Sequence, residues 1–237
     1  MNSELKRLLV GLCISLPMTL PATAQAEIVD PAPENLIFSY DVDPGTLSGV
    51  EAYSGNYLGS VDAYDYRQST TSLWVNIDDL VDDWGGMLQV GNDHNERRPG
   101  IWLRPSESKI YTAVKTDPYI SDQLRSEIDL TLDTWINITM VMDSESARLY
   151  YDGSLVSEVE LVVNWPQVFD PTWEVHTARL TSGSVDGRID DVRIYDRALD
   201  ETEIEQMMYN SRYVDVPVPY MISALGLFFA VRNRRKC

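Results

Sequence analysis

The sequence predicts an all-β fold in which two antiparallel sheets pack as a sandwich and one short helix follows the closing strand. Short segments rich in β-branched and aromatic residues recur through residues 36–195, and turn signals separate them at the spacing typical of β-sandwiches. Several segments alternate apolar with polar residues, as a strand does when one face lies against a core. One amphipathic segment, residues 200–211, has the period of a helix instead.

The expected strands follow one another through the central part of the chain. Alternation is clearest in residues 72–77 and 135–143, and Asp152-Gly153 is the strongest signal for a two-residue hairpin. In chain order, we predict strands at residues 36–40, 72–77, 87–90, 99–103, 110–114, 128–132, 135–143, 148–151, 155–163, 173–180 and 189–195, with short irregular strands within 50–66. A single domain at residues 35–213 accommodates all of them.

The closing strand runs directly into the predicted helix. Asp200 is the expected N-cap, and Glu203, three residues later, completes a variant of the capping box. Leu199 before the cap and Ile204 at the fourth helical position can form a hydrophobic staple. We expect the helix to end near residues 210–211.

Residues 187–199, Gly-Arg-Ile-Asp-Asp-Val-Arg-Ile-Tyr-Asp-Arg-Ala-Leu, are followed by this acidic helix and resemble the end of laminin G-like, concanavalin A-like jelly rolls. Residues 98–103, 134–139 and 151–156 are also similar to that family, and the resemblance extends over about residues 35–210. It implies that the sandwich is a jelly roll. The superfamily contains lectins, enzymes and adhesion modules, so the resemblance alone does not specify a function.

The N-terminal 26 residues have the composition of a signal peptide. Lys6 and Arg7 precede an apolar run at residues 8–20, and Ala24 and Ala26 form a small-x-small cleavage site before Glu27. Pro17 within the run and Pro21 directly after it disfavour the alternative, a buried N-terminal helix. Residues 27–34, rich in proline and polar residues, are expected to be a linker.

The C-terminal segment, residues 214–237, resembles a bacterial sorting tail of the PEP-CTERM kind. Pro217 and Pro219 lie in Val-Pro-Val-Pro, an apolar run continues to residue 231, and a basic cluster follows. The motif lacks the glutamate of Val-Pro-Glu-Pro, and a plain tail anchor is the alternative. Both indicate an exported protein, held at least transiently in the membrane by this tail, at the cell surface or in the extracellular matrix.

Charge and cysteine content exclude several classes of function. Cys13 and Cys237 both lie in the end segments, so no disulfide is expected in the domain. Six of the 19 basic residues and one of the 37 acidic residues lie outside residues 27–215, which leaves 13 basic against 36 acidic residues and a net charge of −23. Such a domain repels phosphate backbones, so we expect no nucleic-acid partner.

An enzyme of the glucanase type is an alternative that the residues disfavour. Family 16 glycoside hydrolases carry Glu-x-Asp-x-Glu on a strand, whereas here Glu127 and Asp129 are followed by Thr131 and then Asp133. On a strand, Glu127 and Asp133 would lie roughly 20 Å apart, and a retaining pair of carboxyl groups needs about 5–5.5 Å. The two histidines form no recognisable triad or zinc motif. We therefore expect no catalytic residue and no hydrolysis of β-glucans.

Calcium is the cofactor that the sequence favours, because it binds carboxylate and carbonyl oxygens. Simple alternation places Asp190 on the same, inward face as Val192 and Ile194. A buried carboxylate needs a partner, which can be a cation, backbone amides or an arginine. Asp43 and Asp186 are the further expected ligands, with the loop at residues 92–96 as another source.

Ligand binding is expected at a polar loop and at exposed aromatic rings. The candidates are Asn92, Asp93, His94 and Asn95 in the loop, with Tyr53 and Tyr57 in the irregular segment. We expect Tyr64 and Tyr66 to be exposed as well, and Trp74, Trp102 and Trp135 to fill the core.

Together these features predict a non-catalytic recognition module that binds a glycan or an extracellular protein. A glucanase-type hydrolase and a structural matrix protein without a ligand are the alternatives. A carboxylate pair in a concave face would favour the enzyme, and an exposed Tyr/Trp platform beside an acidic rim would favour the lectin.

Overall fold

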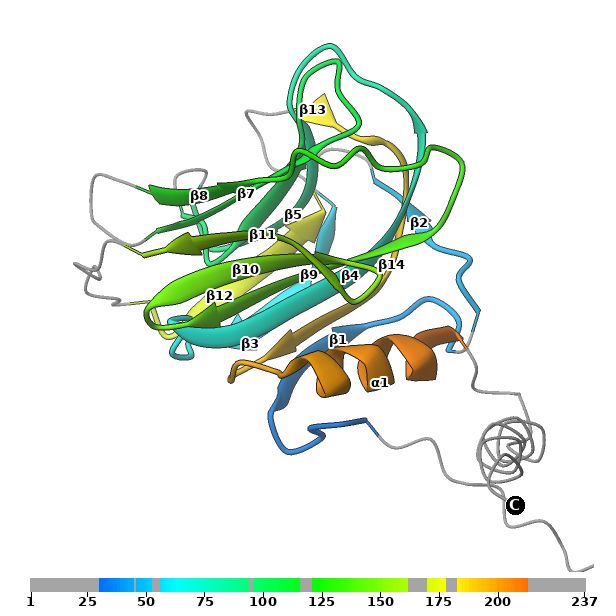
Figure 1. Cartoon of the computed structure of the whole chain (residues 1–237). Helices are drawn as coiled ribbons and strands as arrows, with labels where there is room; N and C mark the ends of the chain where they lie inside the picture. Colours follow the sequence, from blue (N-terminus) through cyan, green and yellow to red (C-terminus); the bar gives the residue numbers. More distant parts are fainter. Residues whose placement is uncertain are drawn as a thin grey trace, which may run out of the picture. The chain divides into compact units, whose positions relative to one another are not determined.

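In the residues that the computed structural model describes, two β-sheets lie face to face and one helix lies against the outer side of the first (Figure 1). The structure describes residues 30–44, 46–52, 56–93, 96–115, 121–161, 170–177 and 183–212. The predicted sandwich with a single helix after the last strand is confirmed. The predicted signal peptide with Ala24 and Ala26, and the predicted sorting tail with Pro217 and Pro219, lie outside the described residues.

The first sheet has the order β1-β14-β4-β9-β10-β11, with the short β2 paired to β14. Its strands are β1 (Leu36–Tyr40), β2 (Val50–Glu51), β4 (Gln68–Asp79), β9 (Ile136–Asp143), β10 (Ser146–Tyr151), β11 (Ser154–Glu160) and β14 (Asp186–Tyr195). All of its pairings are antiparallel. The β10–β11 hairpin turns at Asp152 and Gly153, which both have positive φ, as predicted.

The second sheet has the order β3-β12-β5-β6-β7-β8, with the short β13 paired parallel to β5. Its strands are β3 (Tyr57–Asp62), β5 (Gly85–Val90), β6 (Gly100–Leu103), β7 (Ile110–Lys115), β8 (Ser121–Arg125), β12 (Thr172–Thr177) and β13 (Gly183–Ser184). Strand β8 was not predicted from the sequence, because Ser-Asp-Gln-Leu-Arg has neither strict alternation nor β-branched residues.

The main core fills the space between the sheets with the alternate residues of each strand. In β4 the core residues are Leu73, Val75 and Ile77, and β9 contributes Ile138 and Met140 in the same way. The alternation predicted for both strands is therefore confirmed. β4 is buried on both faces, because the second face lies on the side of the sheet that the helix and its apolar cluster cover.

The helix α1 (Glu201–Arg212) begins as the sequence predicts. The Glu203 amide donates to the Asp200 carboxylate at 2.9 Å, and the Asp200 amide donates to the Glu203 carboxylate at 3.0 Å. Leu199 and Ile204 are buried in a second apolar cluster that joins α1 to the outer face of the first sheet. Fully burying a side chain of this size contributes roughly 1.5–3 kcal/mol, so packing holds the helix on the sheet.

Residues 30–35, which precede the first strand, are fixed to the domain. Ala32 is buried in the apolar cluster beneath α1. The Asp30 carboxylate accepts hydrogen bonds from Arg193 and Tyr195 at the end of β14. The Asn35 amide bonds to Asp196. The described part of the expected linker thus packs against the closing strand.

Two local predictions are wrong. Residues 128–132 form a loop, because the Ser126 hydroxyl accepts the Ile128 amide and turns the chain. Tyr66 is buried and Tyr64 is half-buried, and both rings pack on the buried Trp173 ring at 5.7 and 5.0 Å. Their hydroxyls reach backbone carbonyls, which lets tyrosine lie inside an apolar core.

The described part of the chain contains no helix that is both long and apolar enough to cross a membrane.

Candidate functional site

A row of large side chains crosses the outer face of the second sheet. In β6, Ile101 and Leu103 face the core, so Trp102 between them points outward. Tyr111 on β7 lies directly opposite Trp102, and Arg125 on β8 lies opposite Tyr111. Side chains opposite each other on antiparallel strands are near neighbours, so the row brings two aromatic rings and a guanidinium together.

Two further residues complete what we call the aromatic–arginine cluster: Trp84, Arg97, Trp102, Tyr111 and Arg125. The Trp84 ring, just before β5, lies 4.8 Å from the Tyr111 ring. The Arg97 guanidinium lies 5.2 Å from the centre of the Trp102 ring, and that of Arg125 lies 5.9 Å from Tyr111. Both are at the distance of a cation–π contact.

Two of the three rings in the cluster are buried, and the third is accessible to solvent. Trp102 and Tyr111 are only 6% and 8% exposed, whereas Trp84 is 37% exposed. The Trp102 ring lies over Gly100, where an added Cβ would come within 1.9 Å of it. Glycine at this position is therefore what lets the ring lie flat on the sheet.

The Tyr111 hydroxyl remains neutral in this setting. Burial raises its pKa, and the positive charges of Arg97 and Arg125 offset part of that rise. The hydroxyl can thus donate and accept hydrogen bonds between two cationic groups.

Trp102 is buried, as expected, but it lies in a small cluster on the outer face of the second sheet and not in the core between the sheets. A strand of a sandwich has two faces, and here the smaller Ile101 and Leu103 occupy the core face. Trp74 is fully buried, but it alternates with the core residues of β4 and therefore lies on the outer face of the first sheet. Trp135 precedes β9 and lies half-buried beneath the Arg188 guanidinium, at 5.7 Å.

The polar loop between β5 and β6 lies beside this face. Gln89, which β5 turns outward, donates to the carbonyls of Asp93 and Glu96. The Asn92 side-chain amide donates to the Thr172 carbonyl and accepts from the Glu174 amide, so it ties the loop to β12. His94 and Asn95 lie outside the described residues. Ligand binding by this loop stays a prediction.

Tyr57, the other aromatic candidate that the structure describes, is exposed. Its side chain is 59% accessible and lies 5.6 Å from the His176 ring on β12. Tyr53 lies outside the described residues. Tyr57 therefore lies on β3, at the opposite edge of the second sheet from Arg125.

Asp190 is buried, as expected, but a β-bulge changes the face that it occupies. The register with β4 shifts between Asp190 and Arg193, and Asp191 has a φ of 42°. Ile189 and Val192 both face the core, so strict alternation fails between them. Asp190 lies opposite Trp74, on the other face from Val192, and the predicted shared face is wrong.

Backbone amides surround the Asp190 carboxylate. It accepts from the amides of Val42 (3.1 Å), Ser48 (3.0 Å), Gly49 (2.8 Å) and Asp191 (2.8 Å). Three of these donors belong to the loop that joins β1 to β2, both of which pair with β14. The Asp190 side chain thus binds the loop between β1 and β2 to β14, where neither strand pairs with it.

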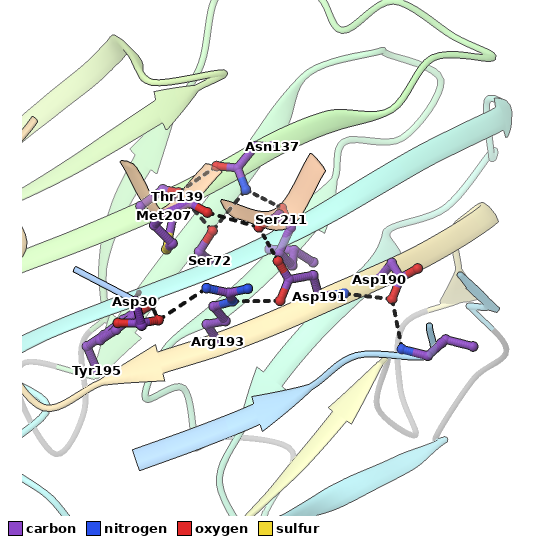
Figure 2. A network of polar contacts seen from close by, with 12 residues as sticks. Asp30, Ser72, Asn137, Thr139, Asp190, Asp191, Arg193, Tyr195, Met207 and Ser211 are labelled. Atoms are coloured by element: carbon purple, nitrogen blue, oxygen red, sulfur yellow. Dashed lines mark hydrogen bonds and ion pairs between the residues drawn. The ribbon is translucent and has the colours of Figure 1, made fainter. Parts of the chain in front are cut away.

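Asp191 faces the helix instead and belongs to a buried polar network (Figure 2). Its carboxylate accepts from Arg193 Nε at 2.6 Å and from the Ser211 hydroxyl of α1. Arg193 also donates to Asp30, and so does the Tyr195 hydroxyl. Burial would lower the pKa of Arg193, but the Asp191 charge and its hydrogen bond raise it above its usual value.

Of the other expected calcium ligands, Asp43 lies near Asp190, because Ser48 donates its amide to Asp190 and its hydroxyl to Asp43. Asp43 is exposed in the β1–β2 loop and accepts from the Ser48 hydroxyl, and Asp186 is exposed at the start of β14. Among the residues that the structure describes, no three His, Cys, Asp or Glu side chains are arranged to hold a metal ion. Calcium binding stays a prediction.

The carboxylates weighed for catalysis do not lie on a strand. Glu127 is exposed and lies near Arg104 and Lys109, Asp129 accepts from Ser108, and Asp133 occupies a turn with positive φ. This loop, with its separate partners, differs from the strand that carries paired carboxylates in the glucanases.

A hollow of about 710 Å³ at the β10–β11 edge is lined by Asp143, Glu145, Glu158 and Glu160 among others. It is the described feature that favours the enzyme alternative. Burial would raise the pKa of Asp143, but hydrogen bonds from Ser146 and Glu145 and the charge of Arg148 lower it overall. A general acid needs a raised pKa, so Asp143 is poorly suited to that role.

Sequence reasoning missed Trp84, Arg97 and Arg125 as site residues. Trp102 and Tyr111 alternate with core residues in two strands predicted as neighbours in sequence, and that alternation was the available signal. Arg125 could not be placed, because its strand was not predicted.

Three comparisons with known proteins are informative. The chain is 24% identical over 156 residues to the acetylcholine receptor subunit alpha-type unc-63 of Caenorhabditis elegans, a match covering 65% of this chain and 29% of that protein. The fold is similar to the binding domain of Paraclostridial Mosquitocidal Protein 1, with 18% identity, a TM-score of 0.53 and coverage of 75% of this chain and 52% of that one. It is equally similar to the binding domain of botulinum neurotoxin DC in complex with SialylT, with 14% identity, a TM-score of 0.54 and coverage of 76% and 52%.

The chain spans about half the length of these toxin domains, and at such identities they show the fold alone. A family model gives the assignment, because it matches residues 50–205, more than half of the chain. The chain belongs to the laminin G-like family described as the concanavalin A-like lectin/glucanases superfamily.

Proposed function

We propose that this protein is an exported, non-catalytic recognition module that binds a glycan through the aromatic–arginine cluster. The observation that carries the proposal is the exposed Trp84 ring, which is backed by Trp102 and Tyr111 and flanked by two guanidinium groups. The helix α1 covers part of the outer face of the first sheet, so the outer face of the second sheet is the better one to receive a ligand.

Binding would combine two kinds of contact and would break no covalent bond. The apolar face of a sugar ring can pack on Trp84, because aromatic faces are flat and largely apolar. The guanidinium groups of Arg97 and Arg125 can donate hydrogen bonds to sugar oxygens.

The comparisons add support at the level of the superfamily. Its description includes lectins, and the structure of one similar toxin domain is in complex with SialylT. The export part of the proposal rests on the sequence: the apolar N-terminal run with Ala24 and Ala26, and the Pro217–Pro219 tail. The ligand would then be met outside the cell, at its surface or in the matrix.

Removing the exposed ring tests the proposal. Trp84→Ala in the full-length chain, kept in a mild detergent, is expected to weaken binding to a glycan array about tenfold, since aromatic contacts contribute roughly 0.5–1.5 kcal/mol beyond their buried area. Leu155→Ala, which removes a 46% exposed side chain from the first sheet, is the matched control. Equal binding by both variants and the parent, or no binding by the parent, would contradict the proposal.

Displacing a ring without removing any aromatic residue gives an independent check. Gly100→Ala adds a Cβ that would meet the Trp102 ring at 1.9 Å, so the ring must leave its place above β6. We expect glycan binding to fall at least as far as in Trp84→Ala. The cost in stability should stay within the 1–3 kcal/mol typical of overpacking. Array binding and a thermal melt measure the two effects, and unchanged binding would show that Trp102 does not support the site.

A further inference from the structure

Most basic side chains in the described part of the chain have a carboxylate partner. The ion pairs are Arg67–Asp65, Arg98–Glu96, Arg104–Glu107, Lys109–Glu127, Arg148–Asp143, Arg193–Asp191 and Arg197–Glu203. Such pairing is expected in residues 27–215, where 36 acidic residues accompany 13 basic ones. Among the described side chains, none of these ion pairs involves Arg97, Lys115, Arg125 or Arg188, and Arg125 donates instead to the Gln123 side-chain oxygen at 3.1 Å.

Three of these four cations share the outer face of the second sheet. Arg97 and Arg125 belong to the aromatic–arginine cluster. Lys115 lies four residues beyond Tyr111 on β7 and therefore on the same face. Its amide donates to the Arg97 carbonyl at 2.9 Å, which brings the two residues together. Arg188 lies on the first sheet, over Trp135.

Three cations on one face, with no described carboxylate paired to them, leave that face locally positive. Three like charges on one face repel one another, and a domain of net charge −23 has acidic residues to spare for pairing them. Guanidinium groups bind carboxylate or sulfate oxygens with paired, charge-assisted hydrogen bonds. An anionic group on the ligand would therefore give these three cations a partner.

The neighbouring groups narrow the class of anion. A nucleic acid would bring many phosphates against a strongly acidic domain. The rings of Trp84, Trp102 and Tyr111 beside the cations suit a ligand that has an apolar face next to its charge. A sugar ring carrying an acidic substituent has both.

We infer that the glycan bound by the aromatic–arginine cluster is acidic, carrying a carboxylate or a sulfate that Arg97, Lys115 and Arg125 recognise. This inference rests on the proposed function and adds the charge of the ligand. Trp84 would position the sugar ring, and the three cations would select for the anionic substituent.

The test is a glycan array of matched pairs, probed with the full-length protein in detergent. The pairs are sialylated and asialo glycans, uronates and their methyl esters, and sulfated and desulfated glycans. We expect the acidic member of at least one class to bind at least tenfold more tightly, with affinity falling as salt is added. Preference within the carboxylate pairs or the sulfate pairs identifies the group that is bound.

Neutral replacements identify the cations responsible. Arg97→Gln/Lys115→Gln/Arg125→Gln should lose the preference for the acidic member, while Arg188→Gln, which removes one arginine over a tryptophan elsewhere, should keep it. Arg125→Gln alone, at an exposed position, gives the same test should the triple variant not fold, with a partial loss expected.

The outcomes separate this inference from the function on which it rests. Equal binding of acidic and neutral members would overturn the acidic ligand and leave glycan recognition intact. Binding of none of them by the parent protein would overturn both. Polyglutamate binding as tightly as the best acidic glycan would replace the glycan by an acidic peptide.

Discussion

Replacing Asp191 by alanine is expected to lower the free energy of unfolding by about 3–5 kcal/mol, the usual cost of removing one partner from a buried ion pair. The Arg193 side chain is 14% exposed, and its Nε lies 2.6 Å from Asp191. Without that carboxylate, the guanidinium retains Asp30 as its remaining ion-pair partner among the described residues. The Ser211 hydroxyl of α1 also loses its acceptor on the sheet.

Chemical denaturation followed by tryptophan fluorescence measures this loss. Asp65→Ala is the matched control, because it breaks the exposed pair with Arg67, whose members are about half accessible. Exposed pairs contribute only about 0–1 kcal/mol. Similar losses in the two variants would mean that the network beneath α1 does not hold the helix to the sheet.

The elements that local sequence determines were predictable. The capping box and staple of α1 depend on residues three to five positions apart, so Leu199, Asp200, Glu203 and Ile204 could be assigned their roles directly. The Asp152-Gly153 hairpin and the alternation in β4 and β9 are local for the same reason. It could also be predicted that the buried Asp190 carboxylate needs a partner, and backbone amides were one of the partners considered.

The predictions that were wrong concern features that depend on contacts between distant segments. Alternation reveals that a strand has two faces, but it does not identify which one meets the core, so Trp102 was assigned to the wrong side. The bulge at Asp190 and Asp191 has no local signature, since it exists through the register with β4. The loop at 128–132 is set by Ser126 and by the pairing of the Leu130 amide with Ser108.

The candidate site was harder to predict than the fold for a similar reason. Its five residues come from β6, β7, β8, the segment before β5 and the loop before β6. Pairing between strands, rather than spacing along the chain, assembles them. Tyr57 and the loop at residues 92–95 were chosen for exposure and polarity. Tyr57, Asn92 and Asp93, which the structure describes, lie on or beside the same sheet without forming the cluster.

Replacing Asp190 by asparagine is expected to lower the free energy of unfolding by about 2–6 kcal/mol. One amide nitrogen would replace an oxygen that accepts two backbone N–H groups, and each buried donor left unpaired costs roughly 1–3 kcal/mol. The β1–β2 loop would lose its attachment to β14. Asp43→Asn, at an exposed carboxylate in the same loop, is the control and should change stability little.

The same variant decides the calcium prediction when each melt is repeated with and without calcium. A ligand that binds only the folded state at a hundredfold excess over Kd adds about 2.7 kcal/mol to the free energy of unfolding. Calcium bound at Asp190 would therefore raise the melting midpoint of the parent and leave that of Asp190→Asn unchanged.

Two features of the site favour opposite results in this calcium test. Burial and the charges of Asp191 and Asp190 raise the pKa of nearby Asp41, a repulsion that a cation would relieve. Each Asp190 oxygen, however, already accepts two amides, which satisfies the carboxylate without a metal. The amide contacts are direct, whereas the repulsion at Asp41 is partial, so we expect the loss in Asp190→Asn to be the same with and without calcium; a calcium shift confined to the parent would show instead that the carboxylate shares its oxygens with a metal ion.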